Sequence, residues 1–300
     1  MVVSLNSCFT VATLTGLSTG MMRTAMDESI FSMPFFQNAL IGGTLIVLML
    51  SVLSFFVVLR KISFIGVGIS HSALGGVALG LVLGTNITLT TTLFCIAIAI
   101  LIGMISRRTG GREDAAIGIT FSGSMALGIV LISLSHSQGL SLFSYLFGSI
   151  LSITRLDIYI IAFYCIATLL LISSLFKPLL HASFDEEVAQ VRGIPVHFLH
   201  YLLLILISLA IVASIKLVGI ILVASLLVLP AATAFQIART YRAIVVLAVG
   251  FGLIALFSGL TVSYKYDLPS GPSIVLTACA IFVVCFAASP WRRSRRNRGG

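Results

Sequence analysis

Long apolar stretches separated by short polar segments run through almost the whole chain. From residue 38 onward, these stretches are each roughly 17 to 25 residues long, the length that crosses a bilayer as a helix. A transmembrane β-barrel would instead show shorter segments of alternating apolar and polar residues, and this sequence lacks them. The pattern predicts an all-α polytopic membrane protein with about nine transmembrane helices, eight being the alternative count, at residues 38–59, 64–84, 89–106, 115–134, 157–176, 198–214, 218–238, 243–262 and 272–289.

The composition agrees with this pattern. Of the 300 residues, 59% are hydrophobic and only 9% are charged, so the chain has too few polar groups to cover a soluble domain of its size. Residues 1–33 lack the basic start and the small-residue cleavage site of a signal peptide, and we expect them to form an external N-terminal lead-in. One transmembrane domain at 34–290 and a basic cytoplasmic tail at 291–300 account for the rest.

The basic residues indicate how the chain is oriented in the membrane. They account for the net charge of +9, yet they gather on one side of the predicted helices and so point to a membrane surface instead of a nucleic acid. With the N-terminus outside and the C-terminus in the cytoplasm, fourteen of the 18 Lys and Arg residues face inward and four face outward. The inward set is Arg60, Lys61, Arg107, Arg108, Arg112, Lys177, Arg192, Arg239, Arg242, Arg292, Arg293, Arg295, Arg296 and Arg298, and the outward set is Arg23, Arg155, Lys216 and Lys265.

This orientation requires that residues 140–153 do not cross the membrane. If they crossed, only eight basic residues would lie inside and ten would lie outside. We therefore expect 140–153 to be a short re-entrant or surface segment. The C-terminal sequence WRRSRRNR would then lie among the anionic lipid headgroups of the inner leaflet, with binding to a protein partner as the alternative.

His71 is the ionisable side chain that lies deepest in a predicted span. All nine acidic residues fall outside the apolar segments, whereas His71 lies within about 5 Å of the middle of the span 64–84. A polar group at this depth indicates a functional site, and imidazole is a good ligand for Zn²⁺, Fe²⁺ and Mn²⁺. The alternative is a structural histidine that bonds a neighbouring carbonyl or hydroxyl group.

The surroundings of His71 favour close helix packing. Small residues recur every fourth position along this span and so form one ridge, which lets neighbouring helices approach closely. The ridge consists of Gly68, Ser72, Gly76, Gly80 and Gly84. His71 lies on the adjacent ridge with Val67 and Gly75, so we expect its imidazole to lie beside a tight helix contact and away from open lipid.

The predicted cytoplasmic loop between the fifth and sixth spans contains a short amphipathic helix. Ser183 to Glu186 reads as a capping box, and Asp185, Glu186 and Glu187 suit the positive end of a helix. Arg192 suits its negative end, and Gly193 ends it. Phe184, Val188 and Val191 share one face. Either the membrane bundle covers this face, or it docks into a groove on a cytoplasmic partner.

Several stretches, in this order and spacing, resemble the permease subunit of the bacterial zinc, manganese and iron ABC importers, the ABC-3 family. The resemblance covers nearly the whole chain from about Met33 onward. It rests on MPFFQNALIGG at 33–43, VVLRKISFIGVGISHSALGGVALG at 57–80, EDAAIGITFSGSMALGIVLIS at 113–133, LFGSIL at 146–151, FDEEVAQVRGIPV at 184–196 and VGIILVASLLVLPAATA at 218–234.

The resemblance implies a type II importer fold and a defined set of partners. Two permease chains, identical or paralogous, would form the channel in the bacterial cytoplasmic membrane. Cytoplasmic ATPase subunits would power it, and an extracytoplasmic metal-binding protein would deliver manganese, zinc or iron. The residues 184–196 would contact the ATPase, and Ser70 and His71 match a Ser-His pair whose histidine lies on the metal route.

One position departs from the family's pattern. Many members carry an aspartate four residues before this histidine, where the two side chains could share an ion, but here the position is Val67. The departure removes a hard oxygen ligand. His71 would then act with groups from a partner chain, or only as a gate.

Other classes of protein fit the sequence less well. The chain has no G-x-x-x-x-G-K-[ST] phosphate loop, so it is expected to be a transport subunit that needs a separate ATPase and holds no permanent cofactor. A secondary carrier would usually need an intramembrane carboxylate. An intramembrane protease would need a serine and a histidine from different helices. A permease for a metal chelate or a vitamin remains the nearest alternative.

Overall fold

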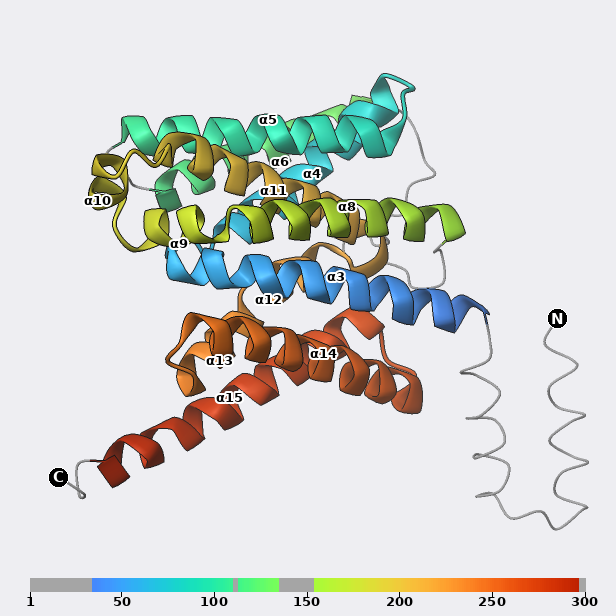
Figure 1. Cartoon of the computed structure of the whole chain (residues 1–300). Coiled ribbons are helices and arrows are strands. Elements are labelled where there is room, and N and C mark those ends of the chain that lie inside the picture. Colours follow the sequence, from blue (N-terminus) through green and yellow to red (C-terminus); the bar gives the residue numbers. More distant parts are fainter. Residues whose placement is uncertain (1–33, 110–112, 135–153, 297–300) are drawn as a thin grey trace, which may run out of the picture.

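The structure is a computed structural model that describes residues 34–109, 113–134 and 154–296, and these residues form helices and the turns between them (Figure 1). The elements, in chain order, are α3 (Pro34–Leu59), α4 (Ile65–Val82), α5 (Ile87–Arg108), α6 (Glu113–Leu134), α8 (Arg155–Ser174), α9 (Phe176–Phe184), α10 (Glu186–Val191), α11 (Val196–Val218), α12 (Ile220–Leu226), α13 (Leu229–Ile237), α14 (Tyr241–Tyr266) and α15 (Ser270–Arg296).

Within the described residues, eight helices are long and apolar enough to cross a membrane. They are α3, α4, α5, α6, α8, α11, α14 and α15, and they confirm eight of the predicted spans. The prediction of one continuous span at 218–238 was wrong, because α12 and α13 divide this stretch into two short helices. The predicted lead-in at 1–33 lies outside the described residues, while α15 continues without a break into the basic tail as far as Arg296.

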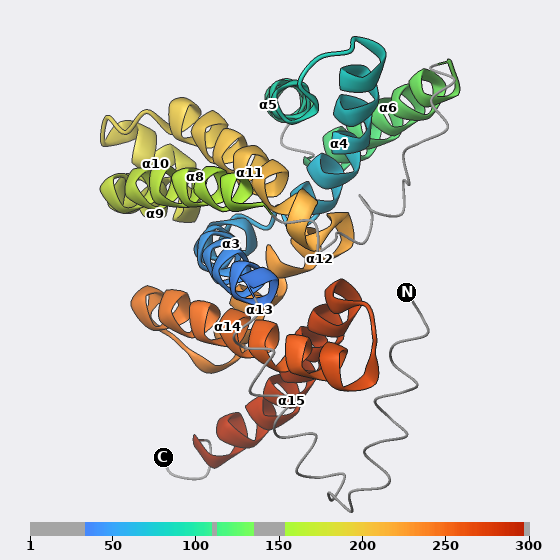
Figure 2. The same ribbon diagram turned by 90° about the vertical axis from the view of Figure 1, so that its right-hand side faces the viewer.

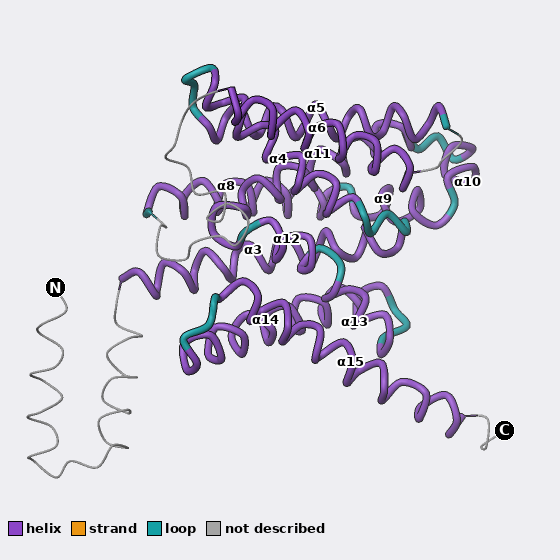
Figure 3. The backbone as a smooth tube through the Cα atoms, turned by 180° about the vertical axis from the view of Figure 1, so that it is seen from behind, coloured by secondary structure: helices purple, strands orange, loops and turns teal. Residues whose placement is uncertain are grey.

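Helix α3 lies at the centre of the bundle and connects three groups of helices (Figure 2). It packs against α8, α9 and α11 on one side and against α12, α13 and α14 on another. Helices α4, α5 and α6 form the third group, which α11 and α12 join to α3. The view from behind also separates α13, α14 and α15 from the other two groups (Figure 3). Helix α3 is part of the apolar core, because it carries large buried side chains, among them Phe55 and Phe56.

A side chain from α3 stabilises the break between α12 and α13. Pro230 lies in the first turn of α13, where its missing N–H leaves no bond unmade. The N–H of Ala231 has no acceptor within its own helix, and it donates to Ser54 Oγ on α3 at 3.2 Å. The Ser54 hydroxyl in turn donates to the carbonyl of Val228 at 3.4 Å. Ser54 therefore caps α13 from another helix. A proline inside an apolar span leaves backbone groups that a neighbouring helix has to bond, and α3 supplies that bond here.

We expect Ser54→Ala to destabilise the chain by about 1–3 kcal/mol, because it leaves buried backbone groups at the helix break without a partner. Ser51 is the matched control. It is buried on the same helix, and its hydroxyl has no hydrogen-bond partner among the residues that the structure describes. Thermal unfolding of the detergent-solubilised protein should show a lower midpoint for Ser54→Ala and little change for Ser51→Ala. Equal shifts in the two variants would contradict this role of Ser54.

The small residues of α4 permit the close helix contacts that the sequence predicted. A methyl group at Gly68 or Gly75 would lie within 3 Å of α6, at Ile117 and at the carbonyl of Ser124, respectively. Gly76 meets α5 in the same way, with the Cα of Thr91 at 2.8 Å from the added methyl position. The ridge therefore divides between two partners, α6 near the start of α4 and α5 near its end.

We expect Gly128→Ala on α6 to destabilise the bundle by roughly 1–3 kcal/mol through overpacking. The added methyl would lie 3.0 Å from the Cα and N atoms of Gly75, and backbone atoms cannot rotate away. Gly118 on the same helix is the control, because a methyl there meets nothing within 4 Å. Unfolding midpoints compared in one detergent test the prediction, which fails if Gly118→Ala is the more damaging substitution.

The two ends of the undescribed segment 135–153 lie at the same end of the bundle. Helices α4 and α6 run in the same direction, because Gly68 faces Ile117 and Gly75 faces Ser124 and Gly128. The end of α6 therefore lies beside the turn from α4 to α5. Asn86 in that turn and Asp157 at the start of α8 line one cavity. The predicted orientation required this arrangement, because it assumed that 140–153 do not cross the membrane. The re-entrant form of 140–153 lies outside the described residues and stays a prediction.

Candidate functional site

The predicted pathway residues lie on α4, between Val67 and Gly75. Ser70 is buried, and its hydroxyl donates to the carbonyl of Gly66 at 2.6 Å, so it is occupied within its own helix. Gly75 is buried against α6. Val67 is 38% exposed and Phe64, one turn earlier, is 64% exposed. This face of α4 is therefore not covered by the part of the chain that the structure describes.

His71 is half-buried on this face, and its ring is held in a fixed orientation. Its Nδ1 atom lies 3.0 Å from the carbonyl oxygen of Val67. A carbonyl oxygen only accepts, so Nδ1 carries the proton in this contact and Nε2 keeps a free lone pair in the neutral ring. The edge of the ring meets Phe121 on α6, with the ring centres 5.3 Å apart. A ligating histidine commonly has such a bond from its other nitrogen to a carbonyl group.

His71 does not form a complete metal site with the other residues that the structure describes. In the described residues, no three His, Cys, Asp or Glu side chains come close enough together to hold a metal ion. The expectation that His71 would lie away from open lipid is met only in part, because α5 and α6 cover one side of its helix and the Val67 side is open. Further ligands would have to come from another molecule, from water or from residues outside the described part.

The short helix predicted for the cytoplasmic loop differs from its prediction at its start. Ser183 does not cap the helix, because it still belongs to α9 and its hydroxyl donates to Leu179 O at 2.6 Å. Asp185 is the N-cap instead, and its carboxylate accepts from Val188 N at 3.0 Å. The helix α10 is accordingly only six residues long.

The end of α10 follows the prediction. Arg192 is the C-cap, and Gly193 adopts a left-handed backbone with φ of 76°. The N–H of Ile194 donates to Ala189 O at 3.1 Å, and the N–H of Gly193 donates to Gln190 O at 2.9 Å. These two bonds form a Schellman motif, which turns the chain sharply into α11.

The apolar face of this segment points away from the described bundle. Phe184 is 70% exposed, Val188 48% and Val191 89%. Ala189 is the side chain of α10 that packs inward. Glu186, Glu187 and Arg192 are also exposed. The alternative that the chain's own bundle covers the face is therefore wrong for the residues described.

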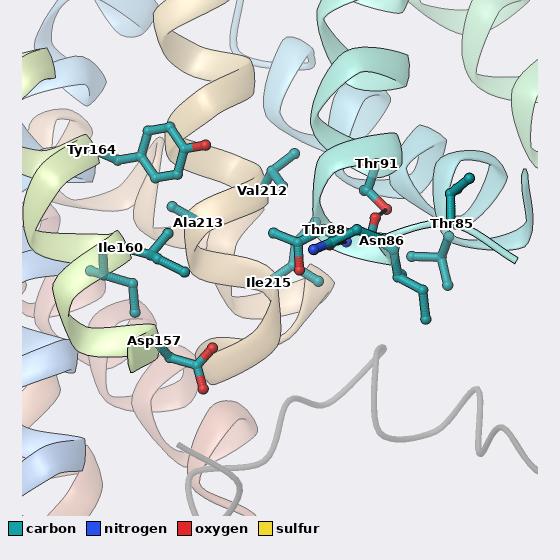
Figure 4. A pocket seen from close by; sticks show the side chains of 13 residues that line it. Thr85, Asn86, Thr88, Thr91, Asp157, Ile160, Tyr164, Val212, Ala213 and Ile215 are labelled. Carbon is teal, nitrogen blue, oxygen red and sulfur yellow. Dashed lines mark hydrogen bonds between the residues drawn. The ribbon is translucent and has the colours of Figure 1, made fainter. Parts of the chain in front are cut away.

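A cavity of about 430 Å³ opens between the ends of α5, α8 and α11, at the opposite end of the bundle from α10 (Figure 4, Figure 1). Its polar groups come from Thr85, Asn86, Thr88, Thr91, Asp157 and Tyr164, and the remaining lining is apolar. The Asp157 carboxylate is already used as a cap, since it accepts from the N–H of Thr154 at 3.0 Å. The cavity does not include His71 and is separate from the predicted pathway.

Arg60 is not among the site residues that were predicted from the sequence. It directly follows α3, and it bonds Ser183 of α9 and His200 of α11. The signal available in the sequence was one arginine at the boundary of a span. Its partners lie 123 and 140 residues away, so no local pattern could reveal them.

In the described residues, eight apolar spans, a broken ninth stretch and the exposed helix α10 define a polytopic helical membrane protein. The chain belongs to the ABC 3 transport family, whose sequence profile matches residues 32–289. The resemblance predicted from the sequence motifs is thereby confirmed.

Relatives and solved structures match the chain along most of its length. The manganese import system permease protein ScaB of Streptococcus gordonii is 40% identical over 264 residues, covering 88% of this chain and 95% of ScaB. The manganese transport system membrane protein MntC of Halalkalibacterium halodurans is 36% identical, covering 88% of this chain and 90% of MntC. The structure resembles PsaBC from Streptococcus pneumoniae, solved in complex with Fab, with a TM-score of 0.80, 37% identity and coverage of 92% and 99% of the two chains. An inward-facing ABC transporter, 20% identical, covers 91% of each chain with a TM-score of 0.62 and supports the fold alone.

Proposed function

We propose that this chain is the membrane-spanning permease subunit of an ATP-driven importer of divalent transition-metal ions, with manganese as the first candidate. The observation that carries this proposal is the match over almost the whole chain to permeases named for manganese import. The similarity to PsaBC supports it at the level of structure. The chain itself is a transport subunit, and ATP would be hydrolysed on a separate subunit.

In this proposal, His71 contributes one ligand on the route of the ion. Its Nε2 atom has the free lone pair that a borderline metal such as Mn²⁺, Zn²⁺ or Fe²⁺ requires, because Nδ1 is engaged by Val67 O. Ser70 and Gly75 are buried where α4 packs against its neighbours, and in this proposal neither of them is a ligand. Because Val67 has no oxygen ligand, the remaining ligands would come from a second permease chain or from water.

The two ends of the bundle suit different partners. The apolar side chains of Phe184, Val188 and Val191 would contact the ATPase in the cytoplasm, a helix-in-groove arrangement. An extracytoplasmic metal-binding protein would deliver the ion at the opposite end. The chain would span the bacterial cytoplasmic membrane several times, with its N-terminus outside and its C-terminus inside. The common location of α10 and the C-terminal end of α15 at one end of the bundle is consistent with this (Figure 1).

Metal uptake into liposomes tests the function. The liposomes would contain this chain with its ATPase and second permease chain, and the delivery protein would be added with Mn²⁺, Zn²⁺ or Fe²⁺. ATP-dependent accumulation of one ion would confirm an importer and identify its substrate. Uptake that follows a proton or sodium gradient without ATP would overturn the proposal in favour of a secondary carrier. ATP-dependent uptake of a chelate or vitamin but of no free ion would change the substrate class.

A further inference from the structure

The turn between α3 and α4 places a charged group inside the end of the bundle that carries α10. Arg60 comes directly after α3, and Lys61 takes a left-handed conformation with φ of 62°. The N–H of Ile62 then donates back to Val57 O at 3.1 Å, which closes the end of α3. Helix α4 begins at Ile65. A force on Arg60 therefore acts on the start of the helix that carries His71.

Arg60 also contacts the elements on both sides of α10. Its Nε atom donates to Ser183 Oγ at 3.0 Å, and Ser183 lies in the last turn of α9. Its Nη1 atom donates to Nδ1 of His200 at 3.2 Å, and His200 lies near the start of α11. One guanidinium group thus bridges α3, α9 and α11 around the short helix α10.

Two buried donors in this cluster have no acceptor. Since Nδ1 of His200 accepts from Arg60, the neutral ring carries its proton on Nε2. This Nε2 and the Nη2 atom of Arg60 are both buried, and neither has a hydrogen-bond partner in the described residues. Buried donors without acceptors are uncommon in folded proteins, and each one that is found needs an explanation.

Two carboxylates face this unmatched charge. Burial lowers the pKa of Arg60, and the negative charges of Glu186 and Glu113 oppose that shift, so the guanidinium stays charged. A second arginine lies in this region, because Arg107 donates to Nε2 of His197, three residues before His200, at 3.0 Å. Glu113 begins the long, packed helix α6, whereas Glu186 is exposed and begins the six-residue α10. Glu186 is therefore the carboxylate that a movement of α10 can bring to Arg60.

We propose that Arg60 is a positioning residue that links α10 to α4, with Glu186 closing onto the free Nη2 atom in one state of the transport cycle and leaving it in another. The proposal rests on the proposed function, because it assumes that an ATPase moves α10. A charge-assisted bond formed at this point would pull α10 toward the α3–α4 turn. Its release would let α4, and His71 with it, return.

The test compares two adjacent carboxylates in the complete transporter. Glu186→Gln keeps the shape of the side chain and removes its charge, and Glu187→Gln is the matched comparison because it removes the same charge from the next residue of the same exposed segment. We measure manganese uptake per ATP hydrolysed in liposomes, together with co-purification of the ATPase. Glu186→Gln should lower uptake per ATP about tenfold with assembly unchanged. Glu187→Gln removes a charge from the same segment but no bond to Arg60, so it should lower uptake per ATP by a clearly smaller factor.

A double variant separates a direct link from two independent effects. Arg60→Gln should lower uptake per ATP as Glu186→Gln does, and the two together should be no worse than either alone. Additive losses, or equal behaviour of Glu186→Gln and Glu187→Gln, would overturn the link. If Arg60→Gln fails to assemble, the comparison of the two carboxylates decides alone. A wild-type transporter that moves no metal with ATP would remove the proposed function and this inference together, whereas normal wild-type transport with an unaffected Glu186→Gln removes only the inference.

Discussion

Replacing His71 with alanine is expected to lower ATP-driven manganese uptake by roughly 100-fold, while the chain still assembles with its ATPase. The substitution removes the one imidazole ligand that α4 offers, and Val67 cannot replace it. Little else should change, because the ring is half-buried and its contacts are an edge to Phe121 and a bond to a carbonyl of its own helix. Uptake into liposomes and co-purification of the ATPase measure the two effects separately.

His181→Ala is the control for this prediction. His181 is exposed on α9, away from α4, and an alanine there should leave uptake unchanged. Normal uptake by His71→Ala would remove this residue from the pathway and favour a structural role. Loss of assembly along with uptake would also contradict the prediction, because it would mean that the ring holds α4 and α6 together.

The spans could be predicted because they depend on a local property. The free energy of transferring an apolar run into lipid depends on the run itself, and eight of the nine predicted runs form long helices. The close contacts of α4 followed equally from a local pattern, since small residues at every fourth position form a ridge in any helix. Gly68 and Gly76 show this in the structure.

The predictions that failed depend on distant parts of the chain. The stretch 218–238 is apolar enough to span, but Gly219 with φ of 80° and the proline in the first turn of α13 divide it. Its break is stabilised by Ser54, which lies 177 residues from its partner Ala231. The residues around Ser183 predicted a helix cap, yet its hydroxyl donates to Leu179 O and accepts from Arg60 Nε instead.

The helix and the histidine of the candidate site could be predicted from the sequence, but the other ligands around a bound ion could not. The position of His71 beside the packed ridge follows from helical geometry. The bond from its Nδ1 atom to Val67 O also lies within one turn. The remaining ligands do not, because the open face of α4 has no covering element in the described residues. Sequence patterns describe one chain, and under the proposed function a second permease chain would cover this face.

Val188→Asp is expected to break the link between ATP hydrolysis and transport. Val188 shares an exposed apolar face with Phe184 and Val191, and burying a new carboxylate in that contact would cost about 2 kcal/mol or more of binding to the ATPase. The chain alone should fold normally, since the side chain is 48% exposed and an exposed substitution changes stability by only about 0.5 kcal/mol. Uptake per ATP should fall roughly tenfold or more, because each 1.4 kcal/mol is a factor of ten in binding.

Gln190→Asp provides a control with the same new charge on the same helix. Gln190 is exposed and lies two residues from Val188, on the opposite side of α10. If the apolar face is the ATPase contact, only Val188→Asp should lose coupling, and ATP hydrolysis by its complex should no longer respond to metal. Loss of coupling in both variants would mean that any negative charge on α10 is harmful. Wild-type coupling in Val188→Asp would show that this face does not bind the ATPase, and α10 would then have to act through Arg60 and α9 alone.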